Sequence, residues 1–326
     1  MLATFDRFIL FLAGLYLRFN NRRLVRQYRS YNGRLPNIGL PGCYSEWMLW
    51  RKLVDRNPDF VMFSDKLECK EYLRRICPEL PVPATLWVGT DTRAIPDELL
   101  QRNVFIKANH GCGFNFNTRG QPVDRAALEQ KAARWLQTDF GRETGEWPYR
   151  QVTRKILVEE SIAIPGAELV EFNIRASNGL AILGSVMFQV KTPGQWHFYL
   201  DPQGQPTWDL MALAGSAIPT EPPDQKLREP YLRAVALAER LSRGTDYARY
   251  DFFWNGQTLF GGEITLFPAC GFIDPRHPHH FENARQKWNI FQAHFFRVPH
   301  RGLKRIYAAV LRRRVSAIRA VKTNIT

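Results

Sequence analysis

Apolar residues recur with helical spacing in three segments of the central chain, each preceded by a residue that can cap a helix. A side-chain oxygen at the N-cap accepts a hydrogen bond from a backbone N–H group that the first helical turn leaves without a partner. The pattern therefore predicts helices over 64–76 with Ser64 as the cap, over 124–140 with Asp124 as the cap, and over 224–244 with Asp224 as the cap.

Apolar runs of strand length lie between and after these helices. Two of them, at 103–109 and 155–160, stand alone. The segments 168–190 and 247–267 each consist of two apolar runs joined by Asn-Gly, a dipeptide that favours the tight turn of a β-hairpin. Helices mixed with antiparallel hairpins are typical of the α+β class and do not fit a doubly wound parallel sheet.

The net charge of +14 is concentrated at the two ends of the chain. Residues 1–60 hold 10 Lys/Arg against 4 Asp/Glu, and residues 301–326 hold 8 Lys/Arg and no acid. The remaining residues, 61–300, are neutral, with 27 cations against 27 acids. This division predicts a basic helical N-terminal region (1–60), a core domain (61–300) and a basic amphipathic C-terminal helix (301–326).

Both basic ends also carry apolar stretches. The run Phe8–Leu17 is about half the roughly 20 residues that a membrane-spanning helix needs, and no signal-peptide cleavage site follows it. It is either a buried helix or a helix that docks on a membrane surface. In 301–326 the apolar residues recur at helical spacing beside eight cations, and we expect this helix to lie on an anionic membrane surface, with Phe8–Leu17 as a second apolar wedge.

Cysteine usage and charge distribution narrow the classes of function. The five cysteines form no CxxC pair, which argues against a disulfide framework or a structural zinc site and favours a reducing compartment. No nucleic-acid partner is expected, because the core is neutral and the cations are not interleaved with aromatic residues that could stack on bases. We therefore expect a cytoplasmic protein, with peripheral attachment to the inner face of the membrane as a hypothesis.

Two carboxylates lie on the second predicted hairpin. Asp251 and Glu263 fall on opposite sides of its turn, so they can lie across from one another on paired strands, with Arg249 on the same face. Opposed carboxylates repel unless a cation lies between them, and oxygen ligands of this kind suit Mg²⁺. The alternative is a solvent-facing pair in which Arg249 neutralises one carboxylate.

Glycines follow a lysine at the end of the strand at 103–109. Lys107 precedes Gly111 and Gly113, which free the backbone to turn its N–H groups toward an anion; the alternative is an ordinary glycine turn. The pattern matches neither the Walker phosphate loop nor the dinucleotide fingerprint. The strand at 155–160 ends in Glu159 and Glu160, which either hold the edge of an adenine or ribose or form an exposed strand end.

The order of these motifs, "SDK…KEYL", "FIKANHGCG", "ILVEESI", "RYDFFWNG" and "FGGEITLFPACGF", resembles the ATP-grasp superfamily, in particular its teichuronopeptide-biosynthesis (TupA-like) branch. The resemblance covers roughly Phe63 to Phe272 and leaves the two ends outside it. It implies an ATP-grasp fold, in which two α+β subdomains grip ATP, with the basic helical ends as extensions. The nucleotide site would lie between about 100–160 and 165–275, with ATP and Mg²⁺ as cofactors.

The resemblance also implies roles for individual residues. Lys107 would hold the α- and β-phosphates of ATP, and the loop with His110, Gly111, Cys112 and Gly113 would cover the triphosphate. The adenine and ribose pocket would be lined by Glu159, Glu160 and Ile162. Mg²⁺ would be bound by Asp251 and Glu263, and Arg249 would stabilise the transferring phosphoryl group. Lys66 matches an early lysine of the family, without a defined role. Thr265 stands where many ATP-grasp enzymes have Asn, and Asn173 with Arg175 stands where the branch often has a lysine.

The implied activity is ATP-dependent carboxylate–amine ligation through an acylphosphate. The branch name implies that an amino acid or peptide, the amine donor, is attached to a uronic-acid-containing surface polysaccharide or its precursor, the acceptor. A kinase of a glycan or other small acceptor, and a non-enzymatic nucleic-acid- or membrane-binding protein, remain alternatives. The loop with His277, His279 and His280 is a rigid proline-bounded loop, an acceptor-binding loop or a metal site.

Overall fold

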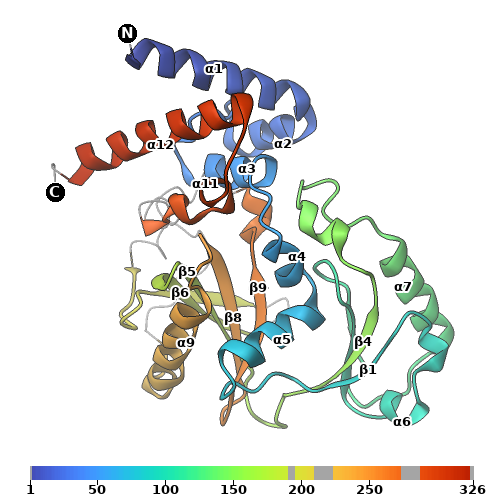
Figure 1. The fold of residues 1–326 in the computed structure, drawn as a ribbon. Helices are drawn as coiled ribbons and strands as arrows, with labels where there is room; N and C mark the ends of the chain where they lie inside the picture. The colour runs from blue at the N-terminus through green and yellow to red at the C-terminus, as the bar shows by residue number, and fades with distance from the viewer. Residues whose placement is uncertain (1, 190–194, 209–222, 273–286, 324–326) are drawn as a thin grey trace.

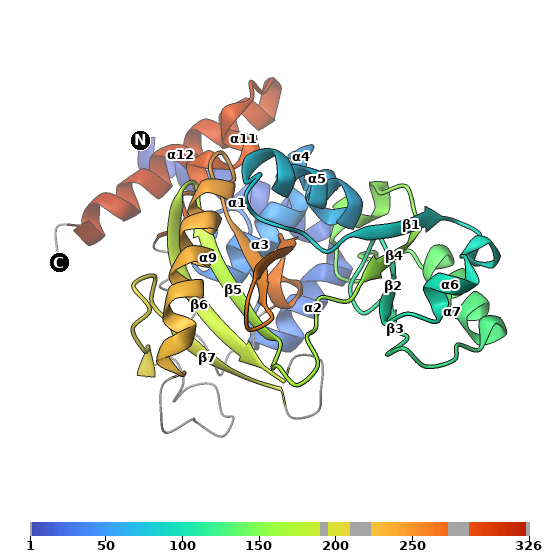
Figure 2. The same cartoon turned by 90° about the horizontal axis from the view of Figure 1, so that it is seen from below.

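The computed structural model describes residues 2–189, 195–208, 223–272 and 287–323. Two sheets lie in two lobes side by side, and long helices from both ends of the chain gather at one end of the molecule (Figure 1, Figure 2). All strand pairs within both sheets are antiparallel, which confirms the predicted α+β class. All five cysteines are free thiols, as expected.

The small lobe (residues 85–160) is built on a four-stranded sheet with strand order β1-β4-β2-β3. Its elements are β1 (Thr85–Gly89), η1 (Thr92–Ala94), α6 (Asp97–Leu100), β2 (Val104–Ala108), β3 (Asn115–Asn117), α7 (Arg125–Gln137), η2 (Trp147–Gln151) and β4 (Ile156–Glu160). Apolar residues of α6 and α7 pack on the sheet in a core of their own. Asp124 caps α7 as predicted, because its side chain accepts a hydrogen bond from the N–H of Ala127 at 3.1 Å.

The large lobe (residues 170–272) is built on a five-stranded sheet with strand order β7-β6-β5-β8-β9. Its elements are β5 (Val170–Ser177), β6 (Leu180–Phe188), β7 (Trp196–Leu200), η3 (Gln225–Leu227), α9 (Arg228–Leu241), β8 (Ala248–Trp254), β9 (Leu259–Thr265) and η4 (Pro268–Gly271). Both predicted Asn-Gly hairpins form, and Asn178 and Gly179 have the positive φ values, 46° and 89°, that their tight turn requires.

Alternation along β5 separates an apolar face from a polar face. Phe172 and Ile174 are buried on the side of α9, where Phe172 meets the ring of Tyr231. Asn173 and Arg175 point to the opposite face. The sheet therefore has one face that packs against a helix and one face that carries polar side chains.

Helices α4 (Asp59–Ser64) and α5 (Lys66–Ile76) pack beside β9. The predicted cap Ser64 is wrong: Ser64 ends α4, and the side chain of Asp65 caps α5 by accepting from the N–H of Leu67 at 2.9 Å. Both residue types can cap a helix, but only Asp65 has the extended backbone, with φ −93° and ψ 115°, that an N-cap needs.

The chain ends form the helical end of the molecule. Its elements are α1 (Leu2–Asn20), α2 (Arg22–Asn32), α3 (Tyr44–Leu53), η5 (Ile290–Gln292), α11 (His294–Arg297) and α12 (Gly302–Thr323). Helices α1 and α12 pack against each other although they come from opposite ends of the chain (Figure 1). Among the helices in the described ranges, none has the length and hydropathy needed to cross a membrane.

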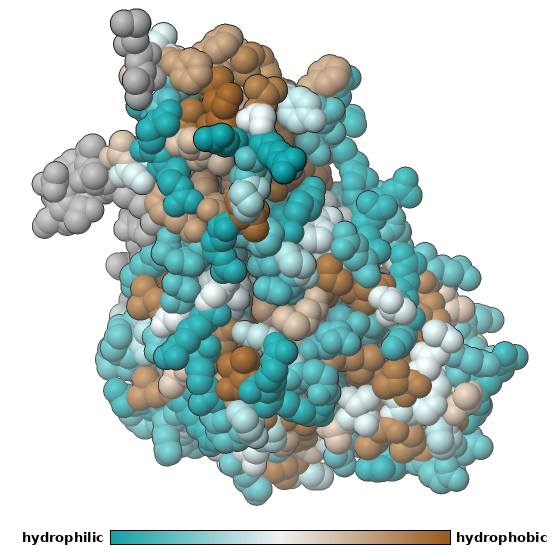
Figure 3. All heavy atoms as spheres, viewed as in Figure 1, coloured by the Kyte–Doolittle hydropathy of each residue, from teal (hydrophilic) through white to brown (hydrophobic). Residues whose placement is uncertain are grey.

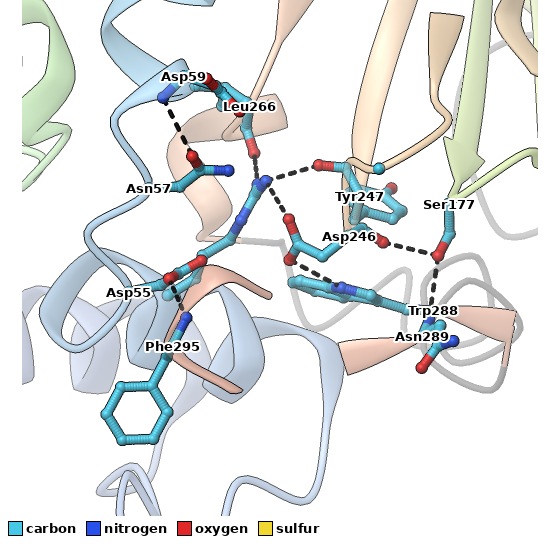
Figure 4. A network of polar contacts seen from close by, with 12 residues as sticks. Asp55, Asn57, Asp59, Ser177, Asp246, Tyr247, Leu266, Trp288, Asn289 and Phe295 are labelled. Carbon is cyan, nitrogen blue, oxygen red and sulfur yellow. Dashed lines mark hydrogen bonds and ion pairs between the residues drawn. The ribbon is translucent and has the colours of Figure 1, made fainter. Parts of the chain in front are cut away.

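A buried arginine ties α3 to the large lobe (Figure 4). Arg51, which is fully buried, donates from Nη1 to the carbonyl of Leu266 at 2.7 Å and from Nη2 to Oδ1 of Asp246 at 2.8 Å. Asp246 also accepts from the indole of Trp288 at 3.1 Å. These contacts join a helix of the basic N-terminal region to the chain just before β8 and directly after β9.

Candidate active site

Two adjoining pockets lie between the lobes. The larger, about 620 Å³, is lined mainly by β2, β3, β4 and the chain after them, and its walls include Phe105, Phe116, Glu160, Ile162 and Phe253. The second is lined by Lys66, Lys70, Lys107, Glu159 and Glu263. Pro83, Lys107, Glu159 and Phe253 line both. The larger volume falls within the range of about 300–1,000 Å³ that small-molecule sites occupy.

Glu159 holds two lysines at the junction of these pockets. Its carboxylate is 6% exposed, and its Oε1 pairs with Lys107 while its Oε2 lies 2.5 Å from Nζ of Lys70. Burial alone would raise the pKa of Glu159, but the two ammonium groups outweigh burial and hold its pKa below the usual value. Two cations and one anion leave one positive charge at the pocket wall. Such a wall favours an anionic ligand.

Lys70 is a residue that sequence reasoning missed. It lies on α5 and donates to the carbonyl of Pro83 at 2.8 Å and to Oγ1 of Thr85 at 3.0 Å, in addition to its pair with Glu159. The available signal was its spacing from Lys66, because residues four apart lie on the same face of a helix. Two lysines on one helix face, directly after a cap, mark that face as a possible anion contact.

Lys66 connects the glycine loop to β9. Its Nζ donates to the carbonyl of Gly111 at 2.8 Å and lies 3.4 Å from Oε1 of Glu263. The backbone N–H of Lys66 donates to the carbonyl of Asn109 at 2.8 Å. The lysine that sequence analysis left without a defined role thus bridges two of the predicted site motifs.

The two glycines of the loop between β2 and β3 share a backbone conformation but differ in how closely they are packed. Both have positive φ, 79° at Gly111 and 76° at Gly113. A Cβ atom at Gly111 would also lie 2.8 Å from the ring of Phe140, whereas one at Gly113 would meet no atom within 4 Å. Gly111 is packed into the small lobe, and Gly113 with the exposed Cys112 lies at its open tip.

His110 differs from its expected role in nucleotide binding. Its side chain is fully buried and meets the ring of Phe114 edge-on. Burial, together with the charge of Arg154, lowers the pKa of His110 to about 4, so the imidazole is neutral at pH 7. The residue therefore contributes its backbone to the loop, while its side chain supports the loop from inside the lobe.

Glu160 and Ile162 lie on the wall of the larger pocket, but Glu159 is used differently from the expectation of an adenine or ribose contact. Glu160 is half exposed and lies 3.2 Å from Arg102. The carbonyl of Ile162 accepts from Nδ2 of Asn255 at 2.9 Å, which joins the chain after β4 to the hairpin of the large lobe. The carboxylate of Glu159 instead belongs to the lysine cluster.

Asp251 is enclosed by hydrogen-bond donors. Arg249 binds it in a bidentate manner, with both N–O distances 2.7 Å, Thr265 donates at 3.1 Å, and Asn173 on the paired strand donates at 3.0 Å. Burial alone would lower the pKa of Arg249, but the carboxylate of Asp251 outweighs burial and raises the pKa of Arg249. Asn173 thus orients Asp251 from the neighbouring strand β5.

A bulge in β9 places Glu263. Tyr250 pairs with Ile264 and Phe252 with Gly261, so both Gly262 and Glu263 lie opposite Asp251. A Cβ atom at Gly262 would lie 2.7 Å from the carbonyl oxygen of Asp251, so the bulge requires glycine there. The extra residue leaves the side chain of Glu263 half exposed on the wall of the second pocket.

The donor set at this hairpin consists of oxygen atoms. Asp251, Glu263 and the hydroxyl of Thr265 are the ligand types that Mg²⁺ prefers. Both oxygens of Asp251 already accept two hydrogen bonds each, and Oε1 of Glu263 lies 3.4 Å from the ammonium nitrogen of Lys66. In the described ranges no group of three or more His, Cys, Asp and Glu side chains is arranged to hold a metal ion. The histidine loop with His277, His279 and His280 lies outside the described residues.

A family model described as TupA-like ATP-grasp matches residues 46–283. The chain therefore belongs to the TupA-like branch of the ATP-grasp family. This confirms the predicted family and fold, and it agrees with the expectation of an enzyme that uses ATP and Mg²⁺. The match begins inside α3, a helix that the charge distribution had placed in the basic N-terminal region.

Solved structures with some likeness include the D-alanine–D-alanine ligase from Bacillus anthracis complexed with ATP, at 16% identity, with 63% of this chain and 55% of that chain covered and a TM-score of 0.35. Another is the ATP-grasp ligase PsnB complexed with its minimal precursor, at 13% identity, 68% and 60% coverage and a TM-score of 0.36. A third is the VanG D-Ala:D-Ser ligase from Enterococcus faecalis, at 14% identity, 67% and 57% coverage and a TM-score of 0.38.

The chain spans less than two thirds of the length of each of these three structures. At these TM-scores the family assignment rests on the sequence match alone. The chain matches no curated protein sequence.

Proposed function

We propose that the protein is an ATP-dependent carboxylate–amine ligase that works through an acylphosphate. Its acceptor is a uronic-acid-containing surface polysaccharide or its precursor, and its amine donor is an amino acid or peptide. The observation that carries the proposal is the cleft between the lobes, where Lys66, Lys70 and Lys107 line the same pocket as Glu263. Membership of the ATP-grasp family supports the same reaction class.

The lysines would hold the triphosphate. Lys107 and Lys70 present one uncompensated positive charge beside Glu159, and Lys66 lies within reach of both the glycine loop and Glu263. Glu159 fixes both ammonium groups in place before any ligand arrives. The adjoining pocket of about 620 Å³, with Phe105 and Phe116 in its walls, would take the adenine and ribose.

Asp251 and Glu263 would hold Mg²⁺, which neutralises charge on the phosphates during transfer. Glu263 lies on the pocket wall, and Asp251 would exchange one of its present hydrogen bonds for the ion. Arg249, which orients Asp251, would also stabilise the transferring phosphoryl group. Phosphoryl transfer depends mainly on such positioning and charge neutralisation.

The reaction then runs in two steps. A carboxylate oxygen of the acceptor attacks the γ-phosphorus of ATP, the bond to the β-phosphate oxygen breaks, and ADP leaves. The amine nitrogen attacks the acyl carbon of the resulting acylphosphate, inorganic phosphate leaves, and the nitrogen loses a proton to give the amide. The loop with Gly111 and Gly113 would close over the phosphates and keep water from hydrolysing the acylphosphate.

The proposed location is the cytoplasm, with peripheral attachment to the inner face of the membrane. An enzyme that modifies a lipid-linked polymer benefits from lying where that polymer is made. The basic ends of the chain, which together account for the net charge of +14, support this location.

The decisive experiment measures ADP release with panels of uronic acids and amines. A ligase releases ADP quickly only when both a carboxylate and an amine are present, and the product is an amide. ADP release that needs no amine, with a stable phosphorylated acceptor as product, would replace this proposal with the kinase alternative. The Glu263→Gln protein, which should fold but turn over at least about 100-fold more slowly, measures the background rate of ADP release.

A further inference from the structure

Helix α1 exposes an unusual number of large apolar side chains. They have exposed fractions between 43% and 68%, and they are Phe5, Phe8, Phe11, Leu12, Leu15, Tyr16 and Phe19. At about 100° per residue these seven positions fall within an arc of about 140° on the helix. They therefore form one continuous face, which we call the α1 aromatic face. Figure 3 shows apolar residues gathered at the end of the molecule where Figure 1 places α1.

The opposite side of α1 is already used for packing. Asp6, Leu10 and Gly14 are buried there, and the carboxylate of Asp6 binds Nη2 of Arg313 on α12 at 2.6 Å. The backbone of Leu10 lies so close to Gly39 that a Cβ atom at Gly39 would be 2.0 Å from its carbonyl oxygen. The helix is thus fixed to the body by one side while its aromatic face points away from it. The buried-helix interpretation of Phe8–Leu17 holds for only one side of the helix.

Helix α12 shows the reverse arrangement. Its apolar stripe is covered in the middle, where Tyr307, Val310, Leu311 and Val315 are all buried, while Leu303, Ile306 and Ile318 are exposed. The hydroxyl of Tyr307 accepts from the indole of Trp50 at 2.9 Å and donates to the carbonyl of Gly39 at 3.1 Å. The buried part of the stripe that the sequence analysis assigned to a membrane therefore anchors α12 to the protein, and the larger exposed apolar surface is on α1.

Cations lie on α1 itself and on α2 and α12, the two helices that contact it. The guanidinium carbon of Arg22 lies 4.2 Å from the ring centroid of Phe19. Further exposed cations on α1, α2 and α12 are Arg7, Arg26, Arg29, Lys304 and Arg305, whereas Arg23 pairs with Glu143 at 2.9 Å and Arg312 donates to the carbonyl of Phe296 at 2.8 Å. Asp6 is the one acidic residue in the sequences of these three helices, and it is buried. Helices that combine exposed aromatic rings with cations and carry no exposed acid of their own complement an anionic, partly apolar partner.

We propose that the α1 aromatic face inserts into the interfacial region of an anionic phospholipid bilayer, while the cations of α2 and α12 contact lipid headgroups. Amphipathic helices of this kind bury their apolar face about 5–10 Å into the boundary between headgroups and acyl chains. Aromatic side chains favour that boundary, and each nearby Lys or Arg adds to the attraction of an anionic surface. The inference builds on the proposed membrane location but is independent of the proposed reaction.

Co-sedimentation with phosphatidylcholine vesicles, with and without phosphatidylglycerol, tests this surface. The main variant is Phe8→Ser/Phe11→Ser/Phe19→Ser. Its matched control removes three exposed apolar residues from α12, as Leu303→Ser/Ile306→Ser/Ile318→Ser. We expect the α1 variant to lose about 100-fold in vesicle partitioning at low salt, and the α12 variant to stay within about threefold of the unaltered protein. Phe8→Leu/Phe11→Leu/Phe19→Leu should retain binding.

Thermal unfolding and ATP affinity should be unchanged in all three variants, because the substitutions lie on exposed positions far from the cleft. If the unaltered protein does not co-sediment with anionic vesicles, the proposed membrane location is wrong while the ligase proposal stands. If the α1 serine variant binds as well as the unaltered protein, the assignment of the surface is wrong. If the protein forms dimers without lipid and the serine variant is monomeric, the face joins two copies of the chain and the lipid proposal is overturned.

Discussion

Two clusters of buried charge lie within the same molecule and serve different ends. The Arg51 cluster joins Arg51 to Asp246, and Nη1 and Nη2 of its guanidinium group also donate to the backbone carbonyls of Leu266 and Tyr247 (Figure 4). The Glu159 cluster joins Glu159 to Lys70 and Lys107. In the first cluster the arginine and the aspartate are 0% and 1% exposed, whereas Lys107 in the second is 15% exposed and lines a pocket.

The difference lies in where the charge is directed. Arg51 is enclosed by Asp246, by backbone oxygens and by the ring of Phe60, whose centroid is 4.2 Å away. The positive charge of Arg51 is therefore neutralised by groups inside the protein. The Glu159 cluster has one more cation than it has anions, and that surplus faces the cleft. Burial and ion pairing therefore do not by themselves mark a functional site. A surplus of charge that opens onto a pocket does.

Removing Arg51 should produce the largest change in stability. Arg51→Met would leave Asp246 buried without its cation, and loss of one partner of a buried pair costs about 3–5 kcal/mol. Urea denaturation should show this loss in the free energy of unfolding. As a control, Arg93→Met removes an exposed pair with Asp91 and should have no measurable effect. An Arg51→Met protein as stable as the unaltered one would mean that the cluster does not hold α3 in place.

Glu263→Gln should affect turnover instead of stability. The substitution keeps the shape of the side chain and removes one negative charge from the proposed Mg²⁺ pocket. We expect ADP release to fall by at least about 100-fold, or about 2.7 kcal/mol of transition-state stabilisation, with an unchanged urea midpoint. Normal turnover in the folded variant would remove the β8–β9 hairpin as the metal site.

Lys107→Ala tests whether the surplus positive charge of the Glu159 cluster binds the phosphates of ATP. Glu159 keeps Lys70 as its partner in this variant, so folding should be little affected. We expect ATP affinity to fall by about 10-fold or more and adenosine affinity to stay unchanged, since only ATP carries phosphates. Titration calorimetry with both ligands measures the difference. Equal losses for the two ligands would make Lys107 a structural residue like Arg51.

A smaller effect should appear in the pH dependence of stability. Burial and the nearby charge of Asp246 raise the pKa of Asp55 to about 7. Because the folded state then binds a proton that the unfolded chain releases near pH 4, stability is highest at low pH in this window and declines as the pH rises toward 7. The slope is at most about 1.4 kcal/mol per pH unit.

Asp55→Asn should flatten that slope. Its Oδ1 keeps the hydrogen bond from the N–H of Phe295, at 2.8 Å in the unaltered protein. Urea denaturation at intervals between pH 4 and 8 would show the change. Identical slopes in the two proteins would assign the pH dependence to other groups.

The sequence by itself determined the local structure and most of the site motifs. The hairpins at Asn178-Gly179 and Asn255-Gly256, the cap at Asp124 and the position of Asp251 and Glu263 on paired strands were all predictable, while the roles of Lys107, Asp251 and Glu263 stay predictions. Turns and caps depend on residues within about four positions of one another, so a short stretch of sequence contains the information. Family motifs are recognisable for the same reason, because each is contiguous.

Only the tertiary structure decided what meets across long distances in the chain. It brought Lys70 to Glu159, turned His110 into the small lobe, and put two residues of β9 opposite Asp251. It also decided which apolar face is covered. Both terminal helices have apolar faces by sequence, but α12 is packed through Tyr307 and its neighbours, whereas one face of α1 stays open. Burial depends on a partner surface, and the residues that join these two helices are 307 positions apart.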